Sequence, residues 1–235
     1  MYLSTPYRQL NWMYLSFVNS WLLLNPFRLG ADWRFGAVPL ITILDLHNLL
    51  TVANFTVVAW LGVFAINGGE RRRKIVLIAL ALILFPYIPA SNLFFPVGFV
   101  IAERVLYLPS MGFCLLVGYG TWCALQGTRN VGLRVTIVLS LLGLLALHAG
   151  RTVLRNDDWD SNLTLYRSGA KFNPRNGVML TNLGIEYGRL KNFSYAERLY
   201  RTSIEVSPTH SKGYANLGGL MEALKRYDEA EWVST

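Results

Sequence analysis

The sequence of 235 residues is 53% hydrophobic and has a mean hydropathy of +0.33, which is too apolar for a typical soluble domain. Its net charge of +8 could suggest a nucleic-acid partner, but many of the cations lie beside long apolar runs, so membrane topology explains them and no nucleic acid is expected. Two cysteines, Cys114 and Cys123, do not make a disulfide framework, and no Cys/His cluster has metal-ligand spacing. We therefore expect an all-α chain, with a multi-span membrane region over residues 1–150 and a polar helical region after it.

Five apolar runs predict membrane spans, because a helix needs about 20 apolar residues to cross a bilayer. They cover approximately residues 10–24, 48–67, 75–92, 105–125 and 133–150, and the first is short for an upright helix. The third run continues in apolar sequence to Ala102 and contains Pro86, Pro89 and Pro96. Each proline removes a backbone donor and clashes with the preceding turn. We expect a helix from 75 to 85 or 90, followed by broken, re-entrant or interfacial structure.

A short basic loop, Glu70-Arg71-Arg72-Arg73-Lys74, separates the second run from the third. Such loops are retained in the cytosol during membrane insertion. The short cytosolic loops then hold six cations and the longer opposite loops hold three; the six are Arg71, Arg72, Arg73, Lys74, Arg129 and Arg134, and the three are Arg28, Arg34 and Arg104. Arg151 and Arg155, just past the last run, count against this orientation. Counting spans from the basic loop places the polar C-terminal region on the lumenal or extracellular side.

The C-terminal region repeats itself at an offset of 34 residues. Thr181-Asn182-Leu183-Gly184 recurs as Ala215-Asn216-Leu217-Gly218, and Pro174 recurs as Pro208. This period is typical of tetratricopeptide repeats, which are helical hairpins that stack into an α-solenoid. Residues 151–176 would be a linker and lead-in helix, 177–210 a complete repeat and 211–235 an incomplete one. The residues expected to set the helix packing are Gly184, Ala196, Pro208, Gly218 and Ala230. Because an array needs about three repeats to be stable, the chain is expected to be cut at its C-terminus, with a frayed last helix.

The dipeptide Glu103-Arg104 stands at the start of the fourth run and has two interpretations. Ionisable residues at such a depth are costly, and the pair can simply mark the boundary of a span, with its charges reaching the interface. Alternatively, Arg104 faces the lumen and holds a phosphate through its two-pronged guanidinium. Asp32 and Asp45 lie 13 residues apart with no periodic reason to converge, and His47 and His148 show no base-nucleophile pattern, so these four are interpreted as structural or solvated.

Asn162-Leu163-Thr164 and Asn192-Phe193-Ser194 are acceptor motifs for N-glycosylation if the C-terminal region is lumenal. Asn192 lies in the turn between the two helices of a repeat, which is an accessible position. Asn54-Phe55-Thr56 fits the same pattern but lies inside a span, and it should stay unmodified.

Several stretches together resemble the transmembrane and tetratricopeptide repeat-containing (TMTC) family of O-mannosyltransferases. The longest is Ala102-Glu103-Arg104-Val105-Leu106-Tyr107-Leu108-Pro109-Ser110-Met111-Gly112-Phe113; the others include residues 19–26, 32–41, 90–93, 158–159 and 165–168. The resemblance covers nearly the whole chain. It implies a multi-pass protein of the endoplasmic reticulum membrane with a glycosyltransferase fold of the C type and lumenal repeats. It further implies that mannose passes from dolichyl-phosphate mannose to Ser or Thr of cadherin-type domains, with no covalently bound cofactor.

The resemblance also exposes a gap in the chain. Family members carry their catalytic acidic residues in a first lumenal loop near the start of the protein, and no residue of this sequence matches those positions. The chain is therefore expected to be a fragment or a truncated isoform that does not transfer sugar by itself, with Arg104 and Glu103 as its candidate lipid-phosphate site. The alternative is a non-catalytic scaffold, anchored in the membrane, whose repeats bind a partner in the endoplasmic reticulum.

Overall fold

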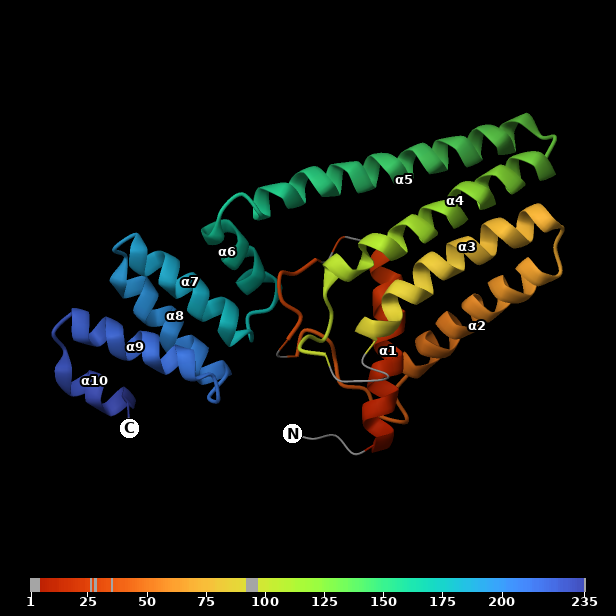
Figure 1. Ribbon diagram of the computed structural model, residues 1–235. Coiled ribbons are helices and arrows are strands. Elements are labelled where there is room, and N and C mark those ends of the chain that lie inside the picture. Colours follow the sequence, from red (N-terminus) through yellow and green to blue (C-terminus); the bar gives the residue numbers. More distant parts are fainter. Residues whose placement is uncertain (1–4, 26, 28, 35, 92–96, 235) are drawn as a thin grey trace. The chain divides into compact units, whose positions relative to one another are not determined.

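The computed structural model describes residues 5–25, 27, 29–34, 36–91 and 97–234 (Figure 1). Within these ranges all regular structure is helical, which confirms the all-α class for the described part of the chain. Pro96 of the third apolar run lies outside the described residues. The chain divides into two compact units. Residues 1–27 and 40–151 form the first, here the membrane unit, and residues 28–39 and 152–235 form the second, here the C-terminal unit.

Among the residues that the structure describes, four helical stretches are long and apolar enough to cross a bilayer, namely His47–Ile66, Glu70–Ala90, Glu103–Gly127 and Val131–Asp158. They correspond to α2 (His47–Ile66), α3 (Glu70–Tyr87) with η1 (Ile88–Ala90), η2 (Glu103–Leu106) with α4 (Tyr107–Gly127), and α5 (Val131–Asp158). Large apolar side chains such as Val57, Trp60 and Leu139 are exposed on them, as lipid contact requires. The chain is therefore a multi-pass membrane protein. Helix α1 (Thr5–Leu24) is 20 residues long but is not among these four, so its assignment as a span stays a prediction.

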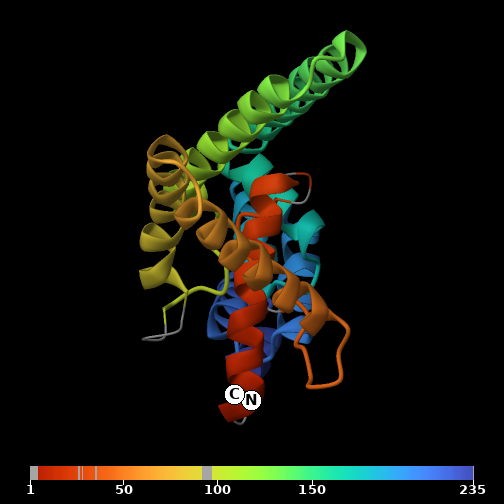
Figure 2. The ribbon, with the colours of Figure 1, turned by 90° about the vertical axis from the view of Figure 1, so that its right-hand side faces the viewer.

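Small residues allow the helices of the membrane unit to approach closely. Ala65 of α2 and Val76 and Leu80 of α3 form a buried cluster. A Cβ atom at Gly112 of α4 would collide with the backbone carbonyl oxygen of Ala79 in α3, so only glycine permits this spacing. Helices α4 and α5 then run antiparallel from the turn at residues 128–130 (Figures 1 and 2).

The basic segment expected to be a loop is instead the first turn of α3. Gly69 is the extended residue before this helix, and the connection between α2 and α3 shortens to residues 67–69. The helix continues over the charges because Glu70 and Lys74 pair four residues apart at 2.6 Å, and because arginine is a good helix former. At the other end, Pro86 is tolerated in the last turn of α3, and the chain passes through η1 into Ser91.

The C-terminal unit contains two helical hairpins after a single helix, α6 (Asn162–Phe172). The hairpins are α7 (Gly177–Arg189) with α8 (Phe193–Val206), and α9 (Ser211–Ala223) with α10 (Tyr227–Ser234). Their first helices begin 34 residues apart, at Gly177 and Ser211, and the turns match because Lys191 and Lys225 both adopt a φ of 60°. Ala196 and Ala230 are buried between helices, whereas Pro208 is exposed in the connection before α9.

Candidate functional site

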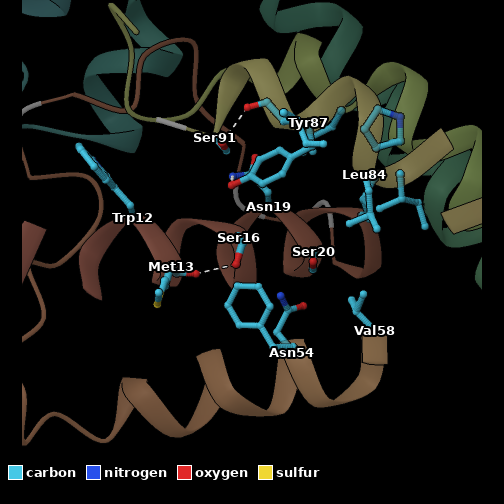
Figure 3. Close-up of a pocket in the computed structure, with 16 residues that line it drawn as sticks. Trp12, Met13, Ser16, Asn19, Ser20, Asn54, Val58, Leu84, Tyr87 and Ser91 are labelled. Atoms are coloured by element: carbon cyan, nitrogen blue, oxygen red, sulfur yellow. Dashed lines mark hydrogen bonds between the residues drawn. The ribbon is translucent and has the colours of Figure 1, made fainter. Parts of the chain in front are cut away.

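A cavity of about 170 Å³ lies inside the membrane unit, between α1, α2, α3 and the start of α4 (Figure 3). Its walls are mostly apolar and aromatic, with Trp12 and Leu23 from α1, Phe55 from α2, Leu84 from α3 and Pro109 from α4. The lining residues of α1 follow the helical repeat of three to four positions, so a single face of this helix meets the cavity; they are Trp12, Met13, Ser16, Asn19, Ser20 and Leu23.

A few polar groups interrupt the apolar wall. The Nδ2 atom of Asn19 donates a hydrogen bond of 2.7 Å to the carbonyl oxygen of Leu15, and it lies 3.5 Å from the hydroxyl oxygen of Tyr87. Figure 3 shows Asn54 directed from α2 toward α1. The hydroxyl groups of Ser16 and Ser91 donate to backbone carbonyl oxygens three residues earlier, at 2.6 and 2.7 Å. Amide and hydroxyl groups such as those of Asn19 and Ser16 can both donate and accept hydrogen bonds, which can orient a ligand in an apolar cavity.

The chemistry of the cavity is that of a binding site. Of the described residues that line it, none is charged, so it offers neither a carboxylate base nor a cation for a leaving phosphate. No group of three or more His, Cys, Asp or Glu side chains that could hold a metal occurs among the residues the structure describes. An apolar chain with a small polar group is the ligand that such walls fit.

The predicted pair Glu103-Arg104 lies at the entrance to α4. Both residues belong to η2, whose last residue, Leu106, lines the cavity. Arg104 is exposed and Glu103 is half-buried. This placement leaves the guanidinium of Arg104 accessible at the start of a span, which fits both the boundary interpretation and the phosphate interpretation.

Asp32 and Asp45 each pair with a residue two positions away in the sequence. Asp32 pairs with Arg34 at 2.8 Å, and Asp45 pairs with His47 at 2.6 Å. Burial raises the pKa of Asp32, but interactions with the side chains of Arg34 and Asn176 outweigh burial and lower it below its usual value. Hydrogen bonds from the backbone and ring of His47 lower the pKa of Asp45. Both carboxyl groups are therefore held in the ionised form by local partners.

The two predicted glycosylation sites lie at the beginnings of helices. Asn162 is the first residue of α6 and Asn192 is the N-cap residue of α8, and both are exposed. The Oδ1 atom of Asn192 accepts a hydrogen bond of 3.2 Å from the backbone nitrogen of Tyr195. A glycan would attach to the side-chain nitrogen, which this cap does not use.

Sequence reasoning missed two features. The cavity could have been suspected from the polar residues Ser16, Asn19 and Ser20, which share a face of an otherwise apolar helix. The docking of residues 29–34 onto the C-terminal unit had no local signal except Trp33, a large aromatic residue in a connection without regular structure that is nevertheless buried.

Comparison with known proteins gives consistent matches over the whole chain. The model of the family "Protein O-mannosyl-transferase TMTC, DUF1736" matches residues 2–59. Human protein O-mannosyl-transferase TMTC3 is 45% identical over 229 residues, which are 97% of this chain and 25% of the relative. The Drosophila melanogaster Tmtc3 protein is 37% identical over the same shares, and human TMTC1 is 40% identical over 91% of this chain and 24% of that protein.

The chain spans about a quarter of the length of these relatives. No solved structure matches it. The matches cover at least 91% of the chain, so they extend over both the membrane unit and the C-terminal unit. The chain therefore belongs to the TMTC family.

Proposed function

We propose that this chain is the part of a membrane protein O-mannosyltransferase that holds the lipid-linked donor and carries the acceptor-binding region. The donor is dolichyl-phosphate mannose, and the acceptor is Ser or Thr of a cadherin-type domain. The observation that supports this most strongly is the identity of 45% with a protein O-mannosyl-transferase over 97% of the chain. The relatives are much longer than this chain, so the groups that complete the reaction can lie in sequence that it does not contain.

The cavity of the membrane unit supports a lipid-linked donor. A polyisoprenoid chain is apolar along its length, and burial of apolar surface in such a cavity is favourable by about 25 cal/mol per Å². The uncharged polar groups of Asn19 and Asn54 would fix the position of the donor through hydrogen bonds. The donor phosphate must stay outside these walls, because the negative charge of a phosphodiester needs cationic partners.

We assign the phosphate to Arg104. Its guanidinium is accessible at the start of α4, and Leu106, two residues further, belongs to the cavity wall. When the bond between mannose and phosphate breaks, negative charge develops on the departing phosphate, and a cation placed there lowers the barrier. The acceptor hydroxyl also needs a carboxylate base. The described residues of the cavity wall contain none, so we place the base outside this chain.

The orientation follows from the distribution of cations. Arg71, Arg72, Arg73 and Lys74 begin α3, and Arg129 and Arg134 flank the start of α5, so six cations lie at one end of the spans. With that end cytosolic, the C-terminal unit is lumenal in the endoplasmic reticulum. The two hairpins, which we interpret as tetratricopeptide repeats, would then face acceptor proteins in the lumen.

A chimaera tests the proposal. Residues 1–235 would replace the matching segment of human TMTC3, and incorporation of labelled mannose into a cadherin-type acceptor would be measured in microsomes from cells that lack the endogenous enzyme. We expect the chimaera to be active and Arg104→Ala to lower transfer at least tenfold. Arg73→Ala, at the opposite end of the spans, should change transfer less than twofold.

The chimaera also separates the enzyme from the scaffold. The uncharged cavity wall is the observation that favours a scaffold. A chimaera that inserts normally, still binds the acceptor and transfers no mannose would support the scaffold and refute the transferase proposal. Equal activity of the parent chimaera and its Arg104→Ala variant would remove the role of Arg104 alone.

A further inference from the structure

The connection between α1 and α2 is divided between the two units. Its residues 28–39 belong to the C-terminal unit, although they lie more than 100 residues from the rest of it in sequence. The indole of Trp33 packs edge-on against the ring of Phe172, the last residue of α6, with 4.8 Å between ring centroids and 63° between ring planes. Trp33 is only 7% exposed. A Cβ atom at Gly30 would overlap the same phenylalanine ring, so the backbone itself lies against Phe172.

Polar contacts fix the position of this segment. The Nδ2 atom of Asn173 donates a hydrogen bond of 2.8 Å to the backbone oxygen of Arg34. The guanidinium of Arg34 donates hydrogen bonds to both carboxylate oxygens of Asp32, from Nε to Oδ1 at 3.0 Å and from Nη2 to Oδ2 at 2.8 Å. The Asp32 side chain is 10% exposed. The segment therefore meets the connection between α6 and α7 through the aromatic contact of Trp33 and the partly buried hydrogen bond from Asn173.

We infer that residues 29–34 are a clamp. They cover the N-terminal end of the stack formed by helices α6 to α10. They pack on Gly169 and Phe172 of α6 and on the turn that begins α7, a face on which a preceding hairpin would otherwise stack. Arrays of stacked hairpins need a cap at such an end. The clamp supplies it from a connection between membrane helices, so three crossings of the chain join the two units, at residues 27–28, 39–40 and 151–152, instead of one.

The number of spans agrees with the clamp. Between residues 28–39 and residues 152–235 lie the four candidate spans, α2 to α5. Four crossings return the chain to the side from which it started, so both parts of the C-terminal unit can meet on one side of the bilayer. The clamp also lies inside the stretch 2–59 that the family model covers, and it gives that stretch a structural role.

An engineered disulfide tests the clamp in the whole chain. The Cβ atom of Ala31 lies 3.9 Å from the position of a Cβ atom built on Gly169, close to the spacing of about 3.8 Å in disulfides. Ala31→Cys with Gly169→Cys would be made with Cys114→Ser and Cys123→Ser, and free thiols would be counted by maleimide-PEG on gels. The control is Ala31→Cys with Gly218→Cys, because a Cβ atom on Gly218 has nothing within 4 Å.

The outcomes separate the clamp from the proposed lumenal orientation. A bond that forms in cells without added oxidant supports both. If the bond forms only after diamide is added to isolated membranes, the clamp is correct and the lumenal orientation is wrong. If the Ala31→Cys, Gly169→Cys variant still has two free thiols after diamide treatment, as the control pair does, the clamp is wrong.

A second variant covers the case in which the Gly169→Cys substitution displaces Met179, whose sulfur lies 2.7 Å from the built Cβ atom. Trp33→Ala should raise hydrogen exchange at the end of α6 and the start of α7 at least tenfold in the detergent-solubilised chain. Trp159→Ala is the control, because this tryptophan of the same unit is 59% exposed. Equal exchange in the two variants would also overturn the clamp.

Discussion

At the scale of single residues, one sequence pattern has two different environments. Gly184 and Gly218 occupy equivalent positions 34 residues apart in α7 and α9. A Cβ atom on Gly184 would lie 2.5 Å from the Tyr200 ring, whereas a Cβ atom on Gly218 would have no atom of the described side chains within 4 Å. The residue equivalent to Tyr200 in the next hairpin is Ser234, which has no ring. Close packing is therefore decided by the partner residue as well as by the glycine.

We predict opposite effects of alanine at these two positions. Gly184→Ala should destabilise the C-terminal unit by about 1–3 kcal/mol, because it overpacks a buried seam. Gly218→Ala should stabilise α9 by about 0.5–1 kcal/mol, because alanine has the higher helix propensity and no clash arises. Hydrogen exchange of α7 and α9 amides in the whole chain measures both changes. If both substitutions changed the stability in the same direction, close packing of Gly184 against Tyr200 would be refuted.

At the scale of elements, the two hairpins are joined by an ion-pair network. Glu197 of α8 pairs with Arg201 at 2.8 Å and with Arg226, just before α10, also at 2.8 Å. Arg226 pairs in turn with Glu229 of α10 at 2.6 Å, and Arg201 reaches Glu229 at 3.1 Å. Burial raises the pKa of Glu197, but hydrogen bonds from the two arginines outweigh burial and lower the pKa below its usual value. Ionised Glu197 therefore adds the pair with Arg226 to the direct pair between Arg201 of α8 and Glu229 of α10.

The contact between α8 and α10 should weaken in acid. A carboxyl group whose pKa is lower in the folded state stabilises that state. The contribution is complete at pH values above the pKa of the unfolded state, about 4.3 for glutamate. It is lost as the pH falls through the pKa of the folded state. The arginines are partly exposed, so the loss should not exceed about 1 kcal/mol. Hydrogen exchange in α10, corrected for the intrinsic pH dependence, should rise below a pH of about 4.3 in the parent. It should be raised already at neutral pH in Glu197→Gln. Glu205→Gln is the control, because Glu205 is an exposed residue of α8. If hydrogen exchange in α10 were the same in the parent and in Glu197→Gln at every pH, the prediction would be wrong.

At the scale of the whole molecule, the orientation in the membrane determines which surfaces meet which compartment. Cations lie at the start of α3 and at the start of α5. Their positive charge favours a cytosolic position for this end of the spans. Two of them are held by aromatic rings, since Arg71 lies 4.9 Å from the Trp122 ring centroid and Arg72 lies 4.4 Å from that of Phe64. The proposed orientation places the C-terminal unit, with Asn162 and Asn192, in the lumen.

Glycosylation should report this orientation. In microsomes, Asn162→Gln and Asn192→Gln should each remove one glycan, seen as a faster gel mobility that endoglycosidase treatment of the parent reproduces. Asn54→Gln should leave the mobility unchanged, because Asn54 lies within α2 and lines the cavity. Unchanged mobility in both of the first two variants would leave the lumenal assignment without support.

The sequence by itself determined the features that depend on neighbours along the chain. Apolar runs predicted the helices α2 to α5, because the length and hydropathy of a span are local properties. The offset of 34 residues predicted two hairpins with matching boundaries, because turn and helix preferences act over a few residues. The basic segment was misplaced in a loop, because membrane topology says on which side charges lie but not whether their backbone is helical.

Only the tertiary structure decided which distant residues meet. The cavity needs four helices to converge, so the polar face of α1 could raise the suspicion of a site but could not show which helices enclose it. The clamp depends on contacts such as Trp33 with Phe172 and Asn173 with Arg34, which join residues 139 positions apart. Such contacts are selected by shape and by the cost of leaving polar groups unpaired in a buried place. No local pattern records those two quantities, so the sequence alone could not reveal the cavity or the clamp.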